Sequence, residues 1–250
     1  MAAGDTEANI TTPVAQTGAR FDGVDDSIDL GVGNVLGVTS LTSPFSIGLW
    51  INKSDAAGTI NVFSSSRGAN DRFGITISNI VRVGTYNGAI YNNKHSSTNI
   101  TAGKWHRVLV VFDGTTMALY LDGILQSGTT QPAVGNDDMT VIGADVDPLD
   151  KNWNGPISDV HFWNRGLTQE EATEYYSGKI VSGISHRWRL DTDYTDSIGD
   201  VDGTNSGTYL GIIDDETAAA IKADRTTAND SYMMVGIKGQ IISTVIEEAP

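Results

Sequence analysis

Cysteine is absent from this 250-residue sequence. Disulfides, thiolate metal sites and cysteine nucleophiles are therefore excluded, and the chain suits any redox compartment. Apolar runs of the roughly 18 residues that a membrane-spanning helix needs are also missing. The N-terminal segment "MAAGDTEANITTPVAQ" has neither the basic nor the apolar region of a secretory signal. We therefore expect a protein that is made in the cytoplasm and is not inserted into a membrane.

Basic residues are scarce, with 16 Lys and Arg against 31 Asp and Glu and a net charge of −15. This balance argues against nucleic acid and anionic membrane surfaces as partners, and favours cations or neutral ligands. Glutamate is scarcer still, because Glu7 is the sole glutamate before residue 170. Aspartate favours turns and oxygen-rich cation sites, so residues 20–165 are interpreted as strands joined by Asp-bearing turns.

The apolar pattern of the chain supports strands. Apolar residues alternate with others in "FSIGLWI", and Asp-Gly pairs separate three apolar runs in "KWHRVLVVFDGTTMALYLDGILQ". Such pairs indicate hairpins, because glycine accepts the positive φ of a tight turn. "MTVIGAD" and "ISDVHFWN" add two more strands. Many short strands with turn residues between them predict an all-β, two-sheet antiparallel jelly-roll sandwich.

One short helix is well marked in "GLTQEEATEYYSGK". Thr168 is placed as its N-cap, Glu171 completes a capping box, and Gly178 is the expected C′ residue. A weaker helix is expected in "DETAAAIKAD" at 215–224. The tail at 231–250 is interpreted as one or two strands.

Several motifs then occur in a characteristic order: "ARFDGVDDSIDL", "FSIGLWIN", "KWHRVLVVFDGTTMALYLDG", "VIGADVD" and "WNGPISDVHFWNRGLTQEEATEYYSG". This order resembles laminin G-like domains of the concanavalin A-like jelly-roll superfamily, which includes pentraxins. The resemblance covers about residues 18–180. It implies an N-terminal arm at 1–17, a jelly-roll domain at 18–208 and a C-terminal extension at 209–250. The segment at 186–208 resembles one that commonly precedes "FDGVDD" in this family, and here it can complete the sandwich from the other end of the chain.

The resemblance to pentraxins also implies a calcium site. There, acidic residues just after an apolar-Gly strand end bind calcium together with an Asp-Asn pair from an earlier loop. The matching positions here are Asp145 and Asp147, joined by Asn70 and Asp71. The alternative is a solvated turn without a cation, since like charges cost little in water.

Two further acidic groups occur in the sequence. Asp22, Asp25 and Asp26 form one, and "DTDYTDSIGDVDG" the other. The second of these superficially resembles an EF-hand loop, but it lacks the terminal Glu and the flanking helices. It is interpreted as a turn with Asx hydrogen bonds.

Most of the tryptophan and histidine residues are interpreted as structural. The five tryptophans are expected to pack in the core or at sheet edges. Trp153 is the exception, because it lies in a loop and is a candidate ligand contact. The four histidines show no metal-binding spacing and are interpreted as structural or exposed.

No catalytic residue is predicted. Glucanases of this superfamily carry a Glu-x-Asp-x-x-Glu arrangement on one strand, which this chain lacks. The Gly-x-Ser-x-Gly motif of hydrolases is absent as well, and no glycine-rich phosphate loop occurs within a predicted βαβ unit. A glycoside hydrolase is therefore the least favoured of the functions considered.

Two functions remain open. We predict a non-catalytic virion structural or surface protein, such as a capsid decoration, tail or fibre component, because a virion protein needs no signal peptide. The alternative is a calcium-dependent carbohydrate-binding adhesion module at the cell surface. The apolar tail is expected to contact another subunit of a homo-oligomer, or else to dock on its own sandwich. The residues expected at the subunit contact are Met233, Met234, Val235, Ile237, Ile241 and Ile242.

Overall fold

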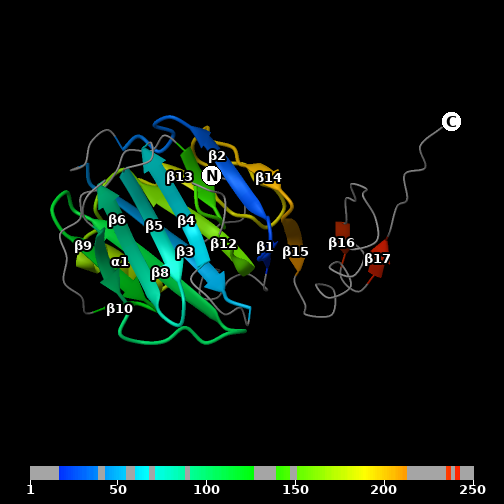
Figure 1. Ribbon diagram of the computed structural model, residues 1–250, viewed down its shortest axis with the longest axis horizontal. Coiled ribbons are helices and arrows are strands. Elements are labelled where there is room, and N and C mark those ends of the chain that lie inside the picture. Colours follow the sequence, from blue (N-terminus) through cyan, green and yellow to red (C-terminus); the bar gives the residue numbers. More distant parts are fainter. Residues whose placement is uncertain are drawn as a thin grey trace.

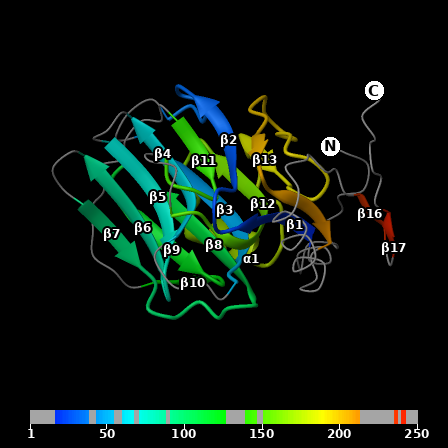
Figure 2. The same ribbon diagram turned by 45° about the vertical axis from the view of Figure 1, so that its right-hand side comes forward.

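The computed structural model of the protein describes residues 17–38, 43–54, 60–67, 71–87, 91–126, 139–146, 151–212, 235–237 and 240–242. Two antiparallel sheets face each other, and Figures 1 and 2 show β4, β5 and β6 of one sheet in front of β3, β8 and β12 of the other. The predicted all-β jelly-roll sandwich with one short helix is therefore confirmed.

Sheet A runs in the order β10-β9-β8-β3-β12-β1-β15, and β13 also pairs with β12. Its strands are β1 (Thr17–Asp22), β3 (Phe45–Asn52), β8 (Trp105–Phe112), β9 (Met117–Leu121), β10 (Ile124–Leu125), β12 (Asn154–Trp163), β13 (His186–Trp188) and β15 (Tyr209–Ile212).

Sheet B runs in the order β14-β2-β11-β4-β5-β6-β7. Its strands are β2 (Ser27–Val32), β4 (Ile60–Arg67), β5 (Asp71–Ile77), β6 (Val81–Asn87), β7 (Tyr91–His95), β11 (Met139–Ile142) and β14 (Thr204–Ser206).

The core lies between the inner faces of the two sheets. Alternate residues of each strand point inward, as period-2 side-chain geometry requires. The Phe45 ring of sheet A packs edge-on against the Phe73 ring of sheet B, with centroids 5.1 Å apart, and is stacked on Phe162 at 5.8 Å. Offset and edge-to-face aromatic contacts of this kind add to the area that the rings bury.

The Asp-Gly turns form as predicted. Asp122 and Gly123 both have positive φ, 51° and 78°, in the turn between β9 and β10. In the turn between β8 and β9, the Asp113 carboxylate accepts hydrogen bonds from the amides of Thr115 and Thr116. These amide contacts outweigh partial desolvation and lower the pKa of Asp113.

The helix α1 (Gln169–Tyr176) also begins where the sequence predicts. The Thr168 hydroxyl accepts a hydrogen bond from the Glu171 amide, and the Glu171 carboxylate accepts one from the Thr168 amide. This carboxylate is also bridged by both terminal nitrogens of Arg165 at 2.7 Å. The helix covers part of the outer face of sheet A through Tyr175 and Ala172, which are buried against Trp163.

The segment after α1 completes both sheets. β13 pairs with β12, β14 with β2, and β15 with β1. This confirms that residues 186–208 can close the sandwich from the far end of the chain. Since β15 follows directly, sheet A extends to Ile212. In the tail, β16 (Val235–Ile237) and β17 (Gln240–Ile242) pair as a hairpin, which agrees with the predicted strands. The second helix expected at 215–224 lies outside the described residues.

Candidate functional site

Asp145 is the member of the predicted calcium set whose side chain the structure describes. It follows β11, and its carboxylate is 9 % exposed. Oδ1 accepts a hydrogen bond from the Val146 amide at 2.8 Å, and Oδ2 lies 2.5 Å from Nζ of Lys151. An ammonium group therefore already neutralises this carboxylate, and a calcium ion would have to displace it.

The backbone around Asp145 is closely held. Gly143 has φ of 89°, and a Cβ at this position would lie 2.1 Å from the Phe21 ring. The Gly143 carbonyl accepts the Trp153 amide at 2.6 Å, and the Lys151 carbonyl accepts the Asn61 amide at 2.8 Å. These bonds fix the position from which Lys151 reaches Asp145.

The other predicted ligands are not brought to Asp145 by the part of the chain that the structure describes. Asn70 and Asp147 lie outside it. Asp71 is the first residue of β5, where its backbone pairs with Arg67 and Asn87, and its side chain is not described. The four-residue calcium site therefore stays a prediction.

A different acidic group does converge. Asp22, Asp25 and Asp26 surround the turn between β1 and β2, and one carboxylate oxygen from each lies within 4.8 Å of the others. Asp26 is fully buried and accepts the Asp22 amide at 2.8 Å, while Asp22 accepts the Val24 amide at 2.8 Å. Asn152 donates its side-chain amide to the Val24 carbonyl, so this turn is tied to the segment that carries Lys151.

Trp153 is not accessible in this arrangement. Its side chain has no exposed surface and belongs to the main core cluster. Its indole Nε1 is buried without a hydrogen-bond partner. The placement fits the packing interpretation of this residue rather than the ligand contact.

Two histidine–aspartate pairs tie loops to sheet A. His106 Nδ1 lies 2.7 Å from Asp122, whose other oxygen accepts the Arg107 amide at 2.9 Å. His186 Nδ1 lies 2.6 Å from Asp196, whose other oxygen accepts the Arg187 amide at 2.9 Å. Each carboxylate thus contacts a histidine ring and the backbone amide of the residue that follows the histidine. These pairs have the structural role expected of the histidines, whereas His95 is exposed.

A buried charged network lies beside α1, and no pattern in the sequence indicated it. Asp159 has φ of 49° at a bulge in β12, and its carboxylate accepts Nε of Arg187 at 2.8 Å. Burial raises the pKa of Asp159, but His161 and Arg187 outweigh it and lower the pKa. Burial lowers the pKa of His161 to about 4, against the opposing effect of Asp159. His161 is therefore neutral at pH 7.

Among the described residues, no helix is long and apolar enough to cross a membrane. Val235, Ile237, Ile241 and Ile242 lie in β16 and β17, whose side chains are not described, and Met233 and Met234 fall outside the described residues. Subunit contact through this tail stays a prediction.

Comparisons with known proteins agree with this architecture. A laminin G-type sequence model, described as the concanavalin A-like lectin/glucanases superfamily, matches residues 22–173. No curated protein sequence matches the chain significantly.

Three solved structures share the fold. A heptameric SAP-like pentraxin from Limulus polyphemus is 17% identical, with a TM-score of 0.55 over 80% of this chain and 96% of its own. A putative carbohydrate binding protein from Bacteroides ovatus is 17% identical, with a TM-score of 0.59 over 80% of this chain, which spans only 60% of that protein. The CBM40 of a Ruminococcus gnavus IT-sialidase is 14% identical, with a TM-score of 0.53 over 64% and 97%. None of these three is named as a virion component, so the virion role stays a prediction from the sequence.

Proposed function

Because the chain belongs to the concanavalin A-like lectin/glucanases superfamily, we propose that it is a non-catalytic carbohydrate-binding module. The observation that carries the proposal is the complete lectin-type sandwich, closed by β13, β14 and β15. Proteins of this fold named as carbohydrate-binding include the Bacteroides ovatus protein and the sialidase CBM40. Since fold alone does not define function, the proposal needs support from the residues of this chain.

Three paired aspartates of the described strands and turns support a non-catalytic role. Glycoside hydrolysis needs two carboxyl groups facing one sugar bond, about 5–10 Å apart. No glutamate occurs between residues 8 and 169. Asp159 is paired with Arg187, Asp122 with His106, and Asp196 with His186. These three aspartates therefore organise the sandwich and are not placed to attack a ligand.

Laminin G-like domains often bind calcium. In this chain, the group formed by Asp22, Asp25 and Asp26 fits a calcium ion better than the position at Asp145. Calcium prefers several hard oxygen ligands, and Asp22, Asp25 and Asp26 supply three carboxylates within 4.8 Å of one another. At Asp145 the Lys151 ammonium holds the position that a cation would need. The three-aspartate turn is thus the proposed location of any calcium that the module binds.

The carbohydrate proposal is tested by presenting the full chain to an array of neutral and acidic glycans. Binding to at least one glycan class is expected, and the bound glycan should be recovered intact after prolonged incubation. A chain that remains folded but binds no glycan at high micromolar concentration would contradict the proposal. Release of new reducing ends, lost when one carboxylate is changed, would contradict its non-catalytic part.

The calcium proposal has its own measurement. Calcium in hundredfold excess over its Kd should stabilise the fold by about 2.7 kcal/mol, seen as a higher melting temperature. Asp25→Asn should abolish this shift, because Asp25 is an exposed member of the group and its loss leaves the buried Asp26 in place. Asp145→Asn is the matched control and should keep the shift. If only the control loses it, calcium binds at the Asp145 corner instead.

A further inference from the structure

The outer face of sheet A is covered unevenly. Under α1, an apolar cluster outside the main core includes Leu109, Trp163 and Tyr175. Beyond this cluster the same face carries Trp50 and Trp105, both partly exposed. Large aromatic side chains left partly in water on a flat sheet are informative, whereas single exposed apolar residues are not.

The strand register of sheet A places Trp50 and Trp105 in two adjacent rows of residues on its outer face. Each row crosses β15, β1, β12, β3 and β8, because paired residues of neighbouring strands lie side by side and alternate residues share a face. The pairs Tyr209↔Arg20, Ser158↔Trp50 and Asn52↔Trp105 fix the alignment. One row is Tyr209, Arg20, Pro156, Asn52 and Trp105, and the other is Gly211, Gly18, Ser158, Trp50 and Arg107.

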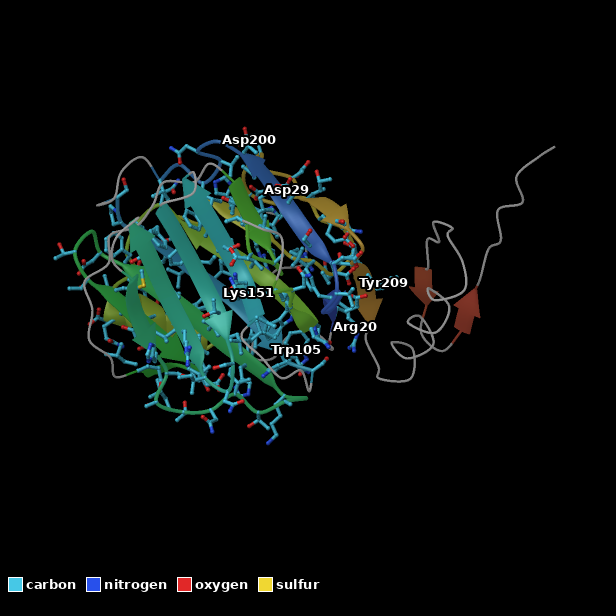
Figure 3. All side chains as sticks on the ribbon, viewed as in Figure 1. Arg20, Asp29, Trp105, Lys151, Asp200 and Tyr209 are labelled. Atoms are coloured by element: carbon cyan, nitrogen blue, oxygen red, sulfur yellow. The ribbon has the colours of Figure 1, made fainter. Side chains whose placement is uncertain are left out.

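The two rows form a platform with aromatic ends and a low centre. Tyr209 stands at the β15 end, and Trp50 and Trp105 stand at the β8 end. Four inter-strand steps of about 4.8 Å separate Tyr209 from Trp105, a span of about 19 Å. The small, buried residues Gly18 and Ser158 keep the part between these ends low. Figure 3 shows Tyr209, Arg20 and Trp105 following one another along the lower right of the sandwich, away from Asp29 and Asp200.

The chemistry of the platform favours an uncharged ligand that is apolar on its ring faces and polar at its edges. Tyr209, Arg20 and Asn52 supply hydrogen-bonding groups between and beside the rings. The two rows contain no carboxylate, although the chain has 31 acidic residues, and the nearest one along β1 is Asp22. A sugar chain matches this pattern, because pyranose rings offer apolar C–H faces and rims of hydroxyl groups.

We propose that this platform binds a linear, neutral glycan lying across the strands, stacked on Tyr209 at one end and on Trp50 and Trp105 at the other. The inference rests on the proposed carbohydrate-binding function and specifies its location and ligand class. The net charge of −15 disfavours polyanionic glycans through long-range repulsion. The platform contains no cation site, so glycan binding there is independent of calcium.

The test compares binding of neutral oligosaccharides and soluble neutral polysaccharides by the full chain and its variants, using calorimetry and affinity electrophoresis. Trp105→Ala and Tyr209→Ala should each weaken binding about tenfold, since Trp and Tyr anchors dominate such interfaces. Tyr176→Ala is the matched control, because Tyr176 is an exposed aromatic on α1 outside the platform, and it should bind as the unmodified chain does. Chelation of calcium should leave the affinity unchanged.

Each contrary outcome has a distinct meaning. If the unmodified chain binds no glycan, both the proposed function and this inference fail. If it binds a neutral glycan and both platform variants bind equally well, the platform fails while the proposed function stands. Binding confined to acidic glycans, or binding abolished by chelation, would overturn the stated ligand class or location. Variants that change only the oligomeric state would identify the platform as a contact between copies of this chain.

Discussion

Under α1, Trp163 and Tyr175 are fully buried, whereas Trp50 and Trp105 on the same face of the same sheet are partly exposed. The covered half is an apolar cluster that encloses a charged network. The open half carries partly exposed aromatic rings at its two ends, with smaller residues such as Gly18 and Ser158 buried between them. Aromatic residues of one type can therefore stabilise the fold or present a surface, depending on whether another element packs above them.

Arg107 marks the border between the two halves. Its guanidinium lies 3.7 Å from the centroid of the Tyr175 ring and 5.0 Å from that of Trp50. It also donates a hydrogen bond to the carbonyl of Tyr176, the last residue of α1, at 3.3 Å. A cation at a helix C-terminus complements the macrodipole, and α1 has no basic residue in its last turn. Arg107 therefore anchors the helix and supports Trp50 at the same time.

The largest expected difference between the halves concerns stability. Trp163→Ala should lower the free energy of unfolding by about 3–5 kcal/mol, because it empties a buried site under α1. Trp105→Ala should cost less than about 1 kcal/mol, because its ring is already partly in water. Denaturant titrations of both variants measure the contrast. Equal losses would mean that the open half is packed as tightly as the covered one.

The next largest effect is expected on acidification, which should lower the free energy of unfolding through His161 in the covered half. Its pKa is about 4 when folded and about 6.5 when unfolded, so the unfolded chain binds the additional proton between these values. Stability is therefore full above pH 6.5 and falls by about 3 kcal/mol as the pH drops towards 4. The pKa of Asp159 is lowered below its ordinary value, so its protonation adds a loss only at lower pH.

The pH effect is measured by denaturant titration at pH 7 and pH 4.5, for the unmodified chain and for His161→Gln. The variant cannot take up this proton, so its stability should depend less on pH over the same range. An identical dependence in both proteins would show that other groups control the response.

The smallest of these effects concerns the start of α1. Thr168→Ala removes the hydroxyl that caps the Glu171 amide and should destabilise the protein by about 1 kcal/mol. Thr173→Ala, an exposed change within the same helix, serves as the control and should be near neutral. The melting temperature of Thr168→Ala should be slightly lower than that of Thr173→Ala. A cap variant as stable as its control would mean that packing alone, and not the capping box, positions the helix.

The features that depend on near neighbours could be predicted from the amino-acid sequence. The positive φ at Asp122 and Gly123, the capping box between Thr168 and Glu171, and the period-2 pattern of β3 are each encoded within a few residues. Local steric and hydrogen-bonding rules are sufficient to predict them. The all-β fold follows from many such signals that agree with one another.

Contacts between residues far apart in the sequence could be identified only from the folded structure. Asp159 meets Arg187 because β13 pairs beside a bulge in β12. Likewise, Tyr209 reaches the row of Trp105 only because β15 closes sheet A against β1. Such contacts depend on strand order and register over long sequence separations. No local pattern encodes them, since a slip of one residue would turn each side chain to the opposite face.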